Sequence, residues 1–326
     1  MSSPVRLVEG EPERAEHRFI GEHPTVLRLL DSIQRAARMD SPVLIQGPTG
    51  AGKELVAQRL HDYSGRTGRL VALNVASLPD TLAESELFGS ARGAFTGADR
   101  DRTGFIEESA GGTLYLDEAA ELSAGLQTKL LRVLETGVVR KIGGTTDRQV
   151  RFRLIVSTQP PARLLVEAGR WRADFYYRVA GISLDVPALA EHSSDIPLLL
   201  DHFLGLLGRP PLGMEKPGVL AEYPWHGNVR ELRRAVERAA FVAGERSVTV
   251  EDVREAVIAL QVPRQAGARE RRLHSRSLRD LEREHIAAVL QETGGNTGAA
   301  ATILGLSRSQ VYRRMQDMGI APSVRR

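Results

Sequence analysis

A glycine-rich segment directly after an apolar run limits the folds open to this chain more than any other feature. Residues 44–54 read LIQGPTGAGKE, in which Gly47, four residues, Gly52 and Lys53 have the spacing of a phosphate-binding loop. The glycines let backbone N–H groups approach phosphate oxygens, and a helix that begins near Gly52 points its positive end at the same anion. The loop needs a strand before it and a helix after it, so it predicts an α/β fold. A chance glycine turn is the alternative.

Apolar runs alternate with amphipathic helical patterns from about residue 17 to residue 188. The runs are PVLIQG, LVALNV, GTLYLDE, FRLIVST and GISLDV. Their nearly continuous apolar character favours strands that are buried on both faces of a parallel sheet. We therefore predict a parallel-sheet α/β domain over residues 17–188.

The rest of the chain falls into segments of different composition. Residues 1–16 are polar and rich in Pro, Glu and Arg, so we predict that they are disordered. Residues 189–260 follow a helical pattern. Residues 261–275 are polar and basic with Pro and Gly, which is typical of a linker. Residues 276–326 form a final helical unit, and no internal repeat is found.

Two acidic residues, Asp117 and Glu118, end the run GTLYLDE. Acids at the carboxyl edge of a buried parallel strand lie where a magnesium–phosphate group binds. We predict that Asp117 holds Mg²⁺ through water, and that Glu118 is the general base or positions the water that attacks the terminal phosphate. Lys53 reaches the outer phosphates in this interpretation. Nucleotide hydrolysis is the predicted chemistry, and two acids that merely end a strand are the alternative.

The final unit, SLRDLEREHIAAVLQETGGNTGAAATILGLSRSQVYRRMQDMGI, has the pattern of three helices. GGN breaks the chain before a short Ala-rich helix, and GLS forms a tight turn before a helix that begins at Arg308. A short helix, a Gly-containing turn and a second helix make a helix-turn-helix. The first helix carries an apolar stripe of Leu278, Leu281, Ile286, Val289 and Leu290.

The last helix has an apolar and a polar face. Val311 and Met315 face inward by their i, i+4 spacing. The outward residues, predicted to meet base edges or phosphates in the major groove of double-stranded DNA, are Arg308, Ser309, Gln310, Arg313 and Arg314. Dimeric binding to paired half-sites is expected, and a helical interaction module that does not bind DNA is the alternative.

Charge and composition narrow the function classes. Residues 264–326 contain twelve arginines and no lysine against six acids, whereas the net charge of the whole chain is only +3. This basic end suggests a polyanionic partner, with a solvated basic tail as the alternative. The chain has no cysteine, which excludes disulfides and thiolate metal sites. Without a signal peptide or an apolar run long enough to cross a membrane, a cytoplasmic location is expected.

The segment ESELFGSARGAFTGA carries the most specific motif, GAFTGA. With it in place, the chain from about Phe19 to Ile320 resembles the AAA+ transcription activators that act on RNA polymerase carrying sigma-54, also called bacterial enhancer-binding proteins. The resemblance implies an AAA+ parallel-sheet P-loop NTPase with a helical lid over residues 189–260 and a Fis-type helix-turn-helix. It also implies ATP and Mg²⁺ as cofactors, assembly into a ring that is expected to be hexameric, and a sigma-54-contacting loop. The loop residues are Gly93, Ala94, Phe95, Thr96, Gly97 and Ala98.

Further residues match this family at its spacing. The resemblance implies that Asn74 restrains the catalytic Glu118 until nucleotide is sensed. It also implies that Arg172 and Arg178 are arginine fingers that reach the site of the neighbouring subunit; surface salt bridges are the alternative for both. Gly143 and Gly144 resemble a second surface loop that supports the first. The implied nucleotide-binding residues are Gly47, Pro48, Thr49, Gly50, Ala51, Gly52, Lys53, Glu54, Ile20, Gly21, the first-sensor residue Gln159 and the lid-sensor residue Arg230.

Several positions depart from the family pattern. Pro48, Ala51 and Gln159 stand where glutamate, threonine and asparagine are expected. PALAEHSSDI lacks the arginines of the family's PPLRER segment, and His226 replaces a proline. Since the lysine, the two acids and the fingers are kept, we expect hydrolysis to survive, while the departures leave the ATPase rate open.

These features predict an ATPase that binds upstream DNA and remodels the closed sigma-54 polymerase complex to an open complex. A DNA-binding regulator that binds ATP without remodelling is the alternative. The family most often carries a sensory domain before the ATPase, whereas fewer than twenty residues precede it here. Two explanations are compatible with this short N-terminal segment. A separate regulatory protein could control the ATPase in trans, or the sensory domain could belong to a longer chain. The target genes, the operator sequence and the activating signal are not specified by these residues.

Overall fold

The computed structural model describes residues 19–94, 100–213, 218–260 and 296–317, together with Ile286, Val289, Leu290 and Thr293. Two compact units divide the chain, Met1–Leu260 and Gln261–Arg326.

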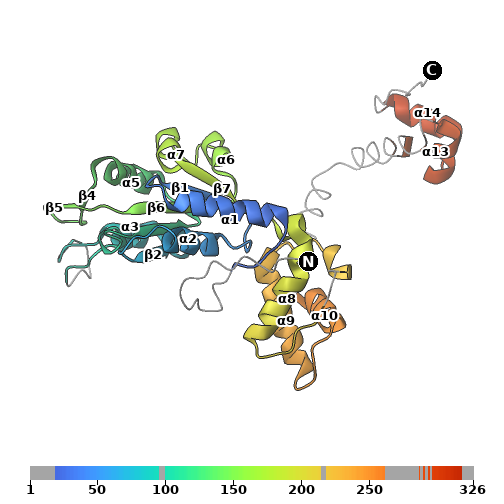
Figure 1. Cartoon of the computed structure of the whole chain (residues 1–326). Helices are drawn as coiled ribbons and strands as arrows, with labels where there is room; N and C mark the ends of the chain where they lie inside the picture. The colour runs from blue at the N-terminus through green and yellow to red at the C-terminus, as the bar shows by residue number, and fades with distance from the viewer. Residues whose placement is uncertain are drawn as a thin grey trace. The chain divides into compact units, whose positions relative to one another are not determined.

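A five-stranded sheet forms the centre of the first unit (Figure 1). Its strands are β1 (Val43–Gln46), β2 (Leu70–Asn74), β3 (Thr113–Asp117), β6 (Arg153–Thr158) and β7 (Ile182–Asp185). They are all parallel and lie in the order β2-β3-β6-β1-β7. The five predicted apolar runs are these five strands, so the predicted parallel α/β sheet is confirmed.

Helices lie on both sides of this sheet (Figure 1). They are α1 (Pro24–Ala37), α2 (Lys53–Asp62), α3 (Asp80–Phe88), α4 (Phe105–Glu108), α5 (Ala124–Thr136), α6 (Ala162–Glu167) and α7 (Ala173–Val179). Short 3-10 helices cover Val75–Ser77 and Ala119–Glu121, and an antiparallel hairpin pairs β4 (Val138–Arg140) with β5 (Asp147–Gln149).

Successive side chains of β3 show how the two faces are covered. Leu114 and Leu116 are fully buried in a core that includes apolar residues of α5 and α7. Tyr115, between them, packs on the other face in a core formed with α1 and α2. Because both faces are buried, β1, β3 and β6 each carry three successive apolar residues and do not alternate.

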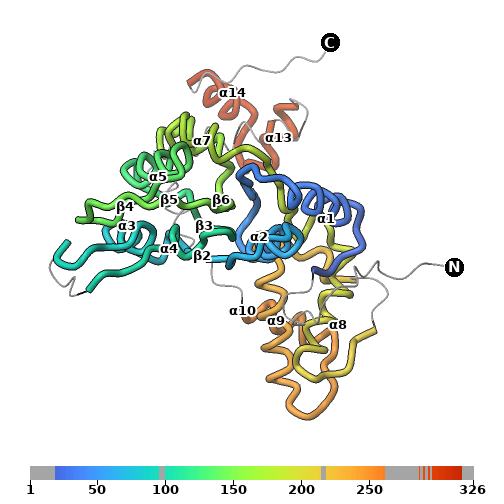
Figure 2. The backbone as a smooth tube through the Cα atoms, turned by 60° about the vertical axis from the view of Figure 1, so that its left-hand side comes forward, coloured from blue at the N-terminus to red at the C-terminus, as the bar shows by residue number. Residues whose placement is uncertain are grey.

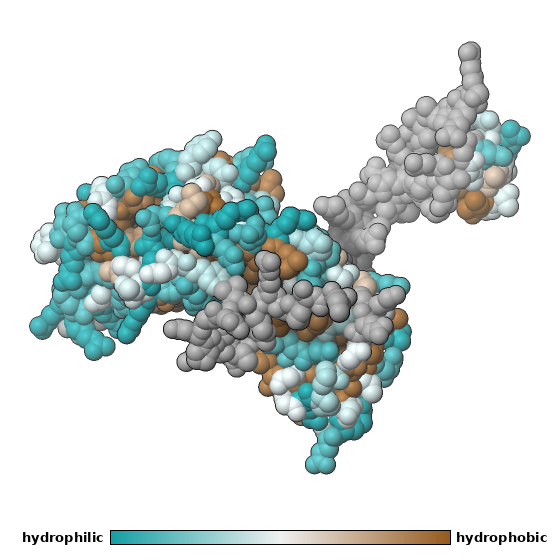
Figure 3. Space-filling model, in the orientation of Figure 1, coloured by the Kyte–Doolittle hydropathy of each residue, from teal (hydrophilic) through white to brown (hydrophobic). Residues whose placement is uncertain are grey.

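Residues after β7 form a helical lid with its own core. It consists of the 3-10 helix η4 (Leu189–Asp195), α8 (Ile196–Leu206), the 3-10 helix η5 (Gly218–Ala221), α9 (Asn228–Ala243) and α10 (Val250–Leu260). In α9 the buried residues Leu232, Ala235, Val236 and Ala239 follow the spacing of one helix face. Helices α8, α9 and α10 gather beside the sheet in both backbone views (Figure 2). Figure 3 shows separate hydrophobic patches among the polar residues over this part.

The second unit contains α13 (Thr297–Leu304) and α14 (Arg308–Asp317). Asn296 caps α13 by accepting hydrogen bonds from the N–H groups of Gly298 and Ala299, and Gly305 ends it in a left-handed conformation. Ile286, Val289 and Leu290 pack with Ala300, Ala301, Val311 and Met315 in one small core. The predicted helix-turn-helix and its inward-facing Val311 and Met315 are therefore confirmed, whereas Leu278 and Leu281 lie outside the described residues. In the described part of the chain, no helix is long and apolar enough to cross a membrane.

Candidate functional site

The carboxyl edge of the sheet brings the predicted site residues together. The phosphate loop follows β1, β2 ends at Asn74, β3 ends at Asp117, and Gln159 follows β6. Asn74 is the register partner of Asp117 in the parallel pair β2–β3. Because parallel strands end at the same edge, residues far apart in the sequence share one site here.

A cavity of about 420 Å³ lies at this edge, with lid residues on its other side. Ten of the residues predicted to bind nucleotide or to catalyse line it: Ile20, Thr49, Gly50, Ala51, Gly52, Lys53, Glu54, Asp117, Glu118 and Arg230. The cavity is large enough for a mononucleotide by the usual dimensions of cofactor pockets.

Lys53 is the first residue of α2 and is 6% exposed. Its Nζ donates to the carbonyl oxygens of Gly47 at 3.0 Å and Pro48 at 3.3 Å. Burial lowers the pKa of this amine, the carboxylates of Glu118 and Asp117 oppose the shift, and Arg230 adds to it. Since its present partners are neutral, an anionic phosphate would be a stronger partner for this ammonium group.

The lid is attached to the phosphate loop through backbone groups. The side-chain N–H of Asn228 donates to the carbonyl oxygen of Thr49 at 3.0 Å, and the N–H of Arg230 donates to that of Gly50 at 3.1 Å. Gly50 has a φ of +77°, and a Cβ there would lie 2.2 Å from the carbonyl oxygen of Gly227. A larger residue at position 50 would therefore push the lid away from the loop.

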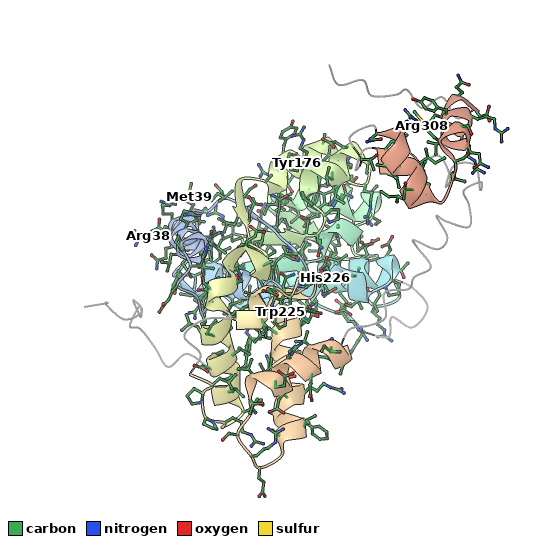
Figure 4. The ribbon with its side chains drawn as sticks, turned by 90° about the vertical axis from the view of Figure 1, so that its right-hand side faces the viewer. Arg38, Met39, Tyr176, Trp225, His226 and Arg308 are labelled. Atoms are coloured by element: carbon green, nitrogen blue, oxygen red, sulfur yellow. The ribbon has the colours of Figure 1, made fainter. Side chains whose placement is uncertain are left out.

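The connection that carries this attachment contains two of the labelled residues of Figure 4, Trp225 and His226, just before α9. Trp225 is 1% exposed, donates to the carbonyl oxygen of Leu220 and stacks edge-on against Tyr223. His226, which stands where a proline was expected, lies in the turn that precedes α9. Trp225 thus anchors the start of α9 in the core of the lid.

The two acids of β3 lie in different environments. Asp117 accepts hydrogen bonds at Oδ1 from the hydroxyls of Tyr115 at 2.9 Å and Ser157 at 2.5 Å. Glu118 has a left-handed backbone, with φ of +52°, and its N–H donates to the Ser157 hydroxyl at 3.2 Å. Both acids line the cavity with Lys53.

The side chain of Asn74 bonds to Asp117 in this structure, while its expected restraint of Glu118 stays a prediction. Its amide donates to Oδ2 of Asp117 at 3.2 Å. The register of β2 and β3 explains this contact, because Asn74 stands directly opposite Asp117, whereas the chain turns away at Glu118.

The donor set fits a magnesium ion bound with a nucleotide. Mg²⁺ prefers oxygen ligands, keeps several waters, and is usually held by one or two carboxylates plus phosphate oxygens. Asp117 and Glu118 supply two carboxylates beside the phosphate loop. In the described part of the chain, no cluster of three acidic or histidine side chains forms a metal site independent of a nucleotide.

Gln159 contacts the phosphate loop instead of lining the cavity. Its side-chain oxygen accepts a hydrogen bond from the hydroxyl of Thr49. The longer arm of glutamine, compared with the expected asparagine, is therefore used to reach the loop. Its amide N–H groups remain as donors for a phosphate oxygen.

Apolar residues at the far end of the cavity were not predicted from the sequence. They come from the segment before α1, from α1 itself and from the lid, and comprise Phe19, Val26, Leu29, Leu199 and Phe203. Ile20 also lines the cavity, and its place in an adenine pocket stays a prediction. Only Ile20 and Gly21 stood out in the sequence, since apolar residues carry no motif.

A buried hydrogen bond between two lid residues, His192 and Asp195, lies beside this apolar pocket. His192 Nδ1 lies 3.1 Å from Oδ2 of Asp195, and both side chains are less than 10% exposed. Oδ1 of Asp195 accepts the N–H groups of Glu22 at 2.9 Å and His23 at 3.0 Å. Burial alone would raise the pKa of Asp195, but these hydrogen bonds outweigh it and lower the pKa. Gly21 passes so close that a Cβ there would lie 2.8 Å from Asp195 Oδ2.

The two predicted arginine fingers lie at α7 and do not line the cavity of their own chain. Arg172 forms a surface ion pair with Asp174 at 2.7 Å, and both side chains are about half exposed. Arg178 is exposed and donates to the carbonyl oxygen of Leu134. Tyr177, between them in the sequence, is 78% exposed. The single chain thus presents both guanidinium groups at its surface.

The two predicted surface loops meet at their bases. The N–H of Ala91 donates to the carbonyl oxygen of Ile142, whose own N–H donates to Gly89. A Cβ at Gly143 would lie 2.7 Å from the Cβ of Ala94, so the second loop packs directly against the start of the first. Phe95, Thr96, Gly97 and Ala98 lie outside the described residues, whereas Gly93 and Ala94 lie within them.

The predicted DNA-binding residues of α14 differ in their exposure and in their hydrogen bonds. Arg308 (labelled in Figure 4), Ser309 and Arg313 are exposed, and Arg314 is partly buried. Gln310 is exposed, but its side-chain oxygen accepts the N–H of Ser307 at 2.8 Å, while Ser307 Oγ accepts the N–H of Gln310 at 3.3 Å. This reciprocal pair is a capping box, so Gln310 has a structural role in addition to its predicted contact with DNA.

Three families match the chain. They are described as Sigma-54 interaction domain over residues 19–185, AAA+ ATPase lid domain over residues 190–270, and Bacterial regulatory protein, Fis family, over residues 277–318. These ranges agree with the α/β part, the lid and the helix-turn-helix unit of the structure.

Individual proteins match over nearly the whole chain. The Nif-specific regulatory protein of Azotobacter vinelandii is 39% identical over 94% of this chain and 59% of its own length. The transcriptional regulatory protein ZraR of Salmonella typhimurium is 40% identical over 92% of this chain and 69% of its own length. The crystal structure of NtrX from Brucella abortus in complex with ATP is 31% identical with a TM-score of 0.67, over 93% of this chain and 70% of that one. The chain thus spans about three fifths to seven tenths of the length of these relatives.

Proposed function

Because the chain belongs to the family of sigma-54-dependent transcription activators, we propose that it hydrolyses ATP to remodel the closed complex of sigma-54 RNA polymerase into an open complex. The observation that best supports this proposal is that Lys53, Asp117 and Glu118 line one cavity beneath the lid. A family of ATPases and a structural relative in complex with ATP support the choice of nucleotide.

Each of these residues has a separate task in the proposed hydrolysis. Lys53 binds the outer phosphates, and the N–H groups of residues 49–53 surround them. Asp117 holds Mg²⁺ through water, and the ion would neutralise phosphate charge during the reaction. Glu118 accepts a proton from, or orients, the attacking water. Arg230 contributes a positive charge from the lid.

We propose that a neighbouring copy of the chain supplies the remaining positive charge that stabilises the transition state of hydrolysis. Arg172 and Arg178 are exposed and do not line their own cavity, which fits fingers that act across a seam between protomers. A finger supplied in trans is worth roughly 10³–10⁵ in rate in related phosphoryl transfers. The active form is then a ring, proposed to be hexameric, and hydrolysis requires assembly.

The motif GAFTGA is proposed to transmit the nucleotide state to sigma-54 through Phe95 and Thr96. The contacts of Gly143 and Ile142 with the base of this loop support a role for the second loop in holding it. The helix-turn-helix is proposed to bind double-stranded upstream DNA as a dimer, which places the protein in the cytoplasm with the polymerase.

One reconstitution tests this proposal. The purified chain is added with ATP to sigma-54 polymerase on a known sigma-54 promoter, and open-complex formation is measured by promoter melting. We expect melting that depends on ATP, and we expect Thr96→Ala to abolish it while ATP hydrolysis and DNA binding persist. Hydrolysis without melting, or melting unaffected by Thr96→Ala, would favour a DNA-binding regulator that uses ATP without remodelling.

A further inference from the structure

One hydroxyl group connects the two acids of the site. Ser157 lies in β6, next to β3, and is fully buried. Its Oγ donates to Oδ1 of Asp117 at 2.5 Å and accepts the backbone N–H of Glu118 at 3.2 Å. A hydroxyl has one proton to donate. The Ser157 hydroxyl donates it to the carboxylate, which has no proton of its own, and uses a lone pair to accept the N–H.

A second hydroxyl reaches the same carboxylate oxygen. Tyr115, two residues before Asp117 in β3, is 1% exposed, and its O–H donates to Oδ1 at 2.9 Å. Burial raises the pKa of this phenol, and the negative charge of Asp117 raises it further. The O–H of Tyr115 thus occupies one acceptor site of Oδ1.

The acceptor sites of Asp117 can be counted. An ionised carboxylate has about four lone-pair sites, two on each oxygen. Tyr115 and Ser157 occupy both sites of Oδ1, while Asn74 occupies one site of Oδ2. Oδ2 is therefore the oxygen of Asp117 with a site left for a further partner.

We propose that Ser157 and Tyr115 are positioning residues of the ATPase site, acting through the two acids. By saturating Oδ1 they leave Oδ2 as the oxygen that binds the hydrated Mg²⁺ ion. Ser157 also fixes the main chain of Glu118 at a φ of +52°, a conformation that is unfavourable for residues other than glycine. Ser157 thus contributes to the choice of the metal-binding oxygen of Asp117, and it also fixes the backbone from which the Glu118 side chain extends. This inference rests on the proposed ATPase function.

Two single substitutions separate these effects. Tyr115→Phe removes one donor to Asp117 and does not affect Glu118, whereas Ser157→Ala removes a donor to Asp117 and the acceptor for the Glu118 N–H. Loss of a residue that supports a metal ligand typically costs 10- to 100-fold in metal affinity or activity. We expect both variants to raise the half-saturating Mg²⁺ concentration about 10-fold. We expect only Ser157→Ala to lower kcat at saturating Mg²⁺, also about 10-fold.

A binding measurement distinguishes positioning from general damage. The affinity for the slowly hydrolysed analogue ATPγS is measured by calorimetry with and without Mg²⁺. Both variants should bind the analogue without Mg²⁺ as the unmodified protein does, and should lose most of the gain that Mg²⁺ gives. Ser157→Thr, which keeps the hydroxyl, should restore both kcat and the Mg²⁺ response.

Matched controls use the same chemical changes elsewhere. Ser183→Ala removes an exposed hydroxyl from β7, and Tyr63→Phe removes a phenol hydroxyl after α2; neither should change the Mg²⁺ response. Thermal unfolding establishes that each variant is folded, and if Ser157→Ala does not fold, Tyr115→Phe decides the Asp117 part. An unchanged Mg²⁺ response in both variants, or an equal loss of affinity without Mg²⁺, would overturn the inference. If the unmodified protein binds ATPγS with Mg²⁺ but does not hydrolyse ATP, the proposed function fails, while the binding experiment still tests the positioning role.

Discussion

The side-chain amide of Asn74 lies 3.2 Å from Oδ2 of Asp117, although the two residues are 43 positions apart in the sequence. Adjacent parallel strands bring them together in register, so the contact follows directly from the order of β2 and β3. The amide uses an acceptor site on the oxygen that we assign to the hydrated metal ion. The second site of Oδ2 is left for the ion, so we predict that the amide of Asn74 weakens Mg²⁺ binding by sharing the negative charge of this oxygen.

Replacing Asn74 with alanine should make the metal site easier to fill. A hydrogen bond of this kind contributes about 1 kcal/mol, which corresponds to roughly a fivefold lower half-saturating Mg²⁺ concentration for ATP hydrolysis. Steady-state ATPase assays over a Mg²⁺ titration measure this. Ser77→Ala, which removes a neighbouring hydroxyl bonded only to the Asn74 carbonyl oxygen, is the control. A higher Mg²⁺ requirement in Asn74→Ala would mean that the amide supports the carboxylate and does not weaken Mg²⁺ binding.

Two inactive variants should complement each other if the fingers act between protomers. Glu118→Gln removes the proposed base and Arg178→Ala removes a finger, and each alone should lower kcat by at least about 10²-fold. In a mixed ring, some seams combine an intact Glu118 from one protomer with an intact Arg178 from its neighbour. Mixing the two variants should therefore recover part of the ATPase rate. If the mixture stays as inactive as its components although size-exclusion chromatography shows mixed rings, Arg178 acts within its own chain.

Arg313 and Gln310 should differ in how their loss affects DNA binding. Arg313→Ala should reduce the slope of log affinity against log salt concentration by about 1, since it removes one phosphate contact. Gln310→Ala breaks the capping box and should lower the unfolding free energy of the helix-turn-helix by about 0.5–2 kcal/mol. Its salt slope should be unchanged. Fluorescence anisotropy at several salt concentrations, with thermal unfolding, measures both. A changed slope in Gln310→Ala alone would assign the phosphate contact to Gln310.

The stability of the lid should depend on pH through Asp252. Arg246 binds both carboxylate oxygens of Asp252, at 2.5 and 2.6 Å, and the N–H and hydroxyl of Thr249 donate to Oδ2 at 2.8 and 2.7 Å. The hydrogen bond from Arg246, followed by that from Thr249, holds the pKa of Asp252 well below its usual range. A depressed pKa stabilises the fold above the unfolded-state pKa, which is about 4, and this stabilisation is lost as the pH falls towards the folded-state pKa.

Asp252→Ala should therefore lower the unfolding free energy by about 1–2 kcal/mol at pH 7. The difference from the unmodified protein should shrink below about pH 4. Glu251→Ala, which removes an exposed ion pair with Arg254, should change stability by less than about 1 kcal/mol at any pH. Chemical unfolding at pH 7, 5 and 3 measures these differences. A constant difference across this range would show that the carboxylate is not the source of the stabilisation.

Much of the nucleotide site could be predicted because it is local in the sequence. The phosphate loop depends on the spacing of Gly47, Gly52 and Lys53, and Asp117 and Glu118 end an apolar run. Parallel strands then bring these local features to one edge whatever the order of the strands. The helix-turn-helix could be predicted for the same reason, since Gly305 and the spacing of Val311 and Met315 are short-range signals.

The remaining contacts depend on register and on long-range packing. Nothing near Asn74 indicates that β2 pairs with β3 so that the amide meets Asp117. Ser157 and Tyr115 lie in buried strands where a hydroxyl carries no motif of its own. The pairing of Asp195 with the backbone of Glu22 spans 173 residues, and no pattern within either segment points to the other.

The lid contacts the phosphate loop at the carbonyl oxygens of Thr49 and Gly50, groups that every amino acid possesses. Exchange of the side chains at positions 48 and 51, where proline and alanine stand in this chain, therefore leaves the attachment points of the lid in place. These hydrogen bonds between the lid and the loop depend on the position of the loop backbone and not on the identity of its side chains. The attachment of the lid thus constrains the backbone shape of the loop, above all at Gly50, whereas the identity of Lys53 is constrained separately by its proposed contact with phosphate.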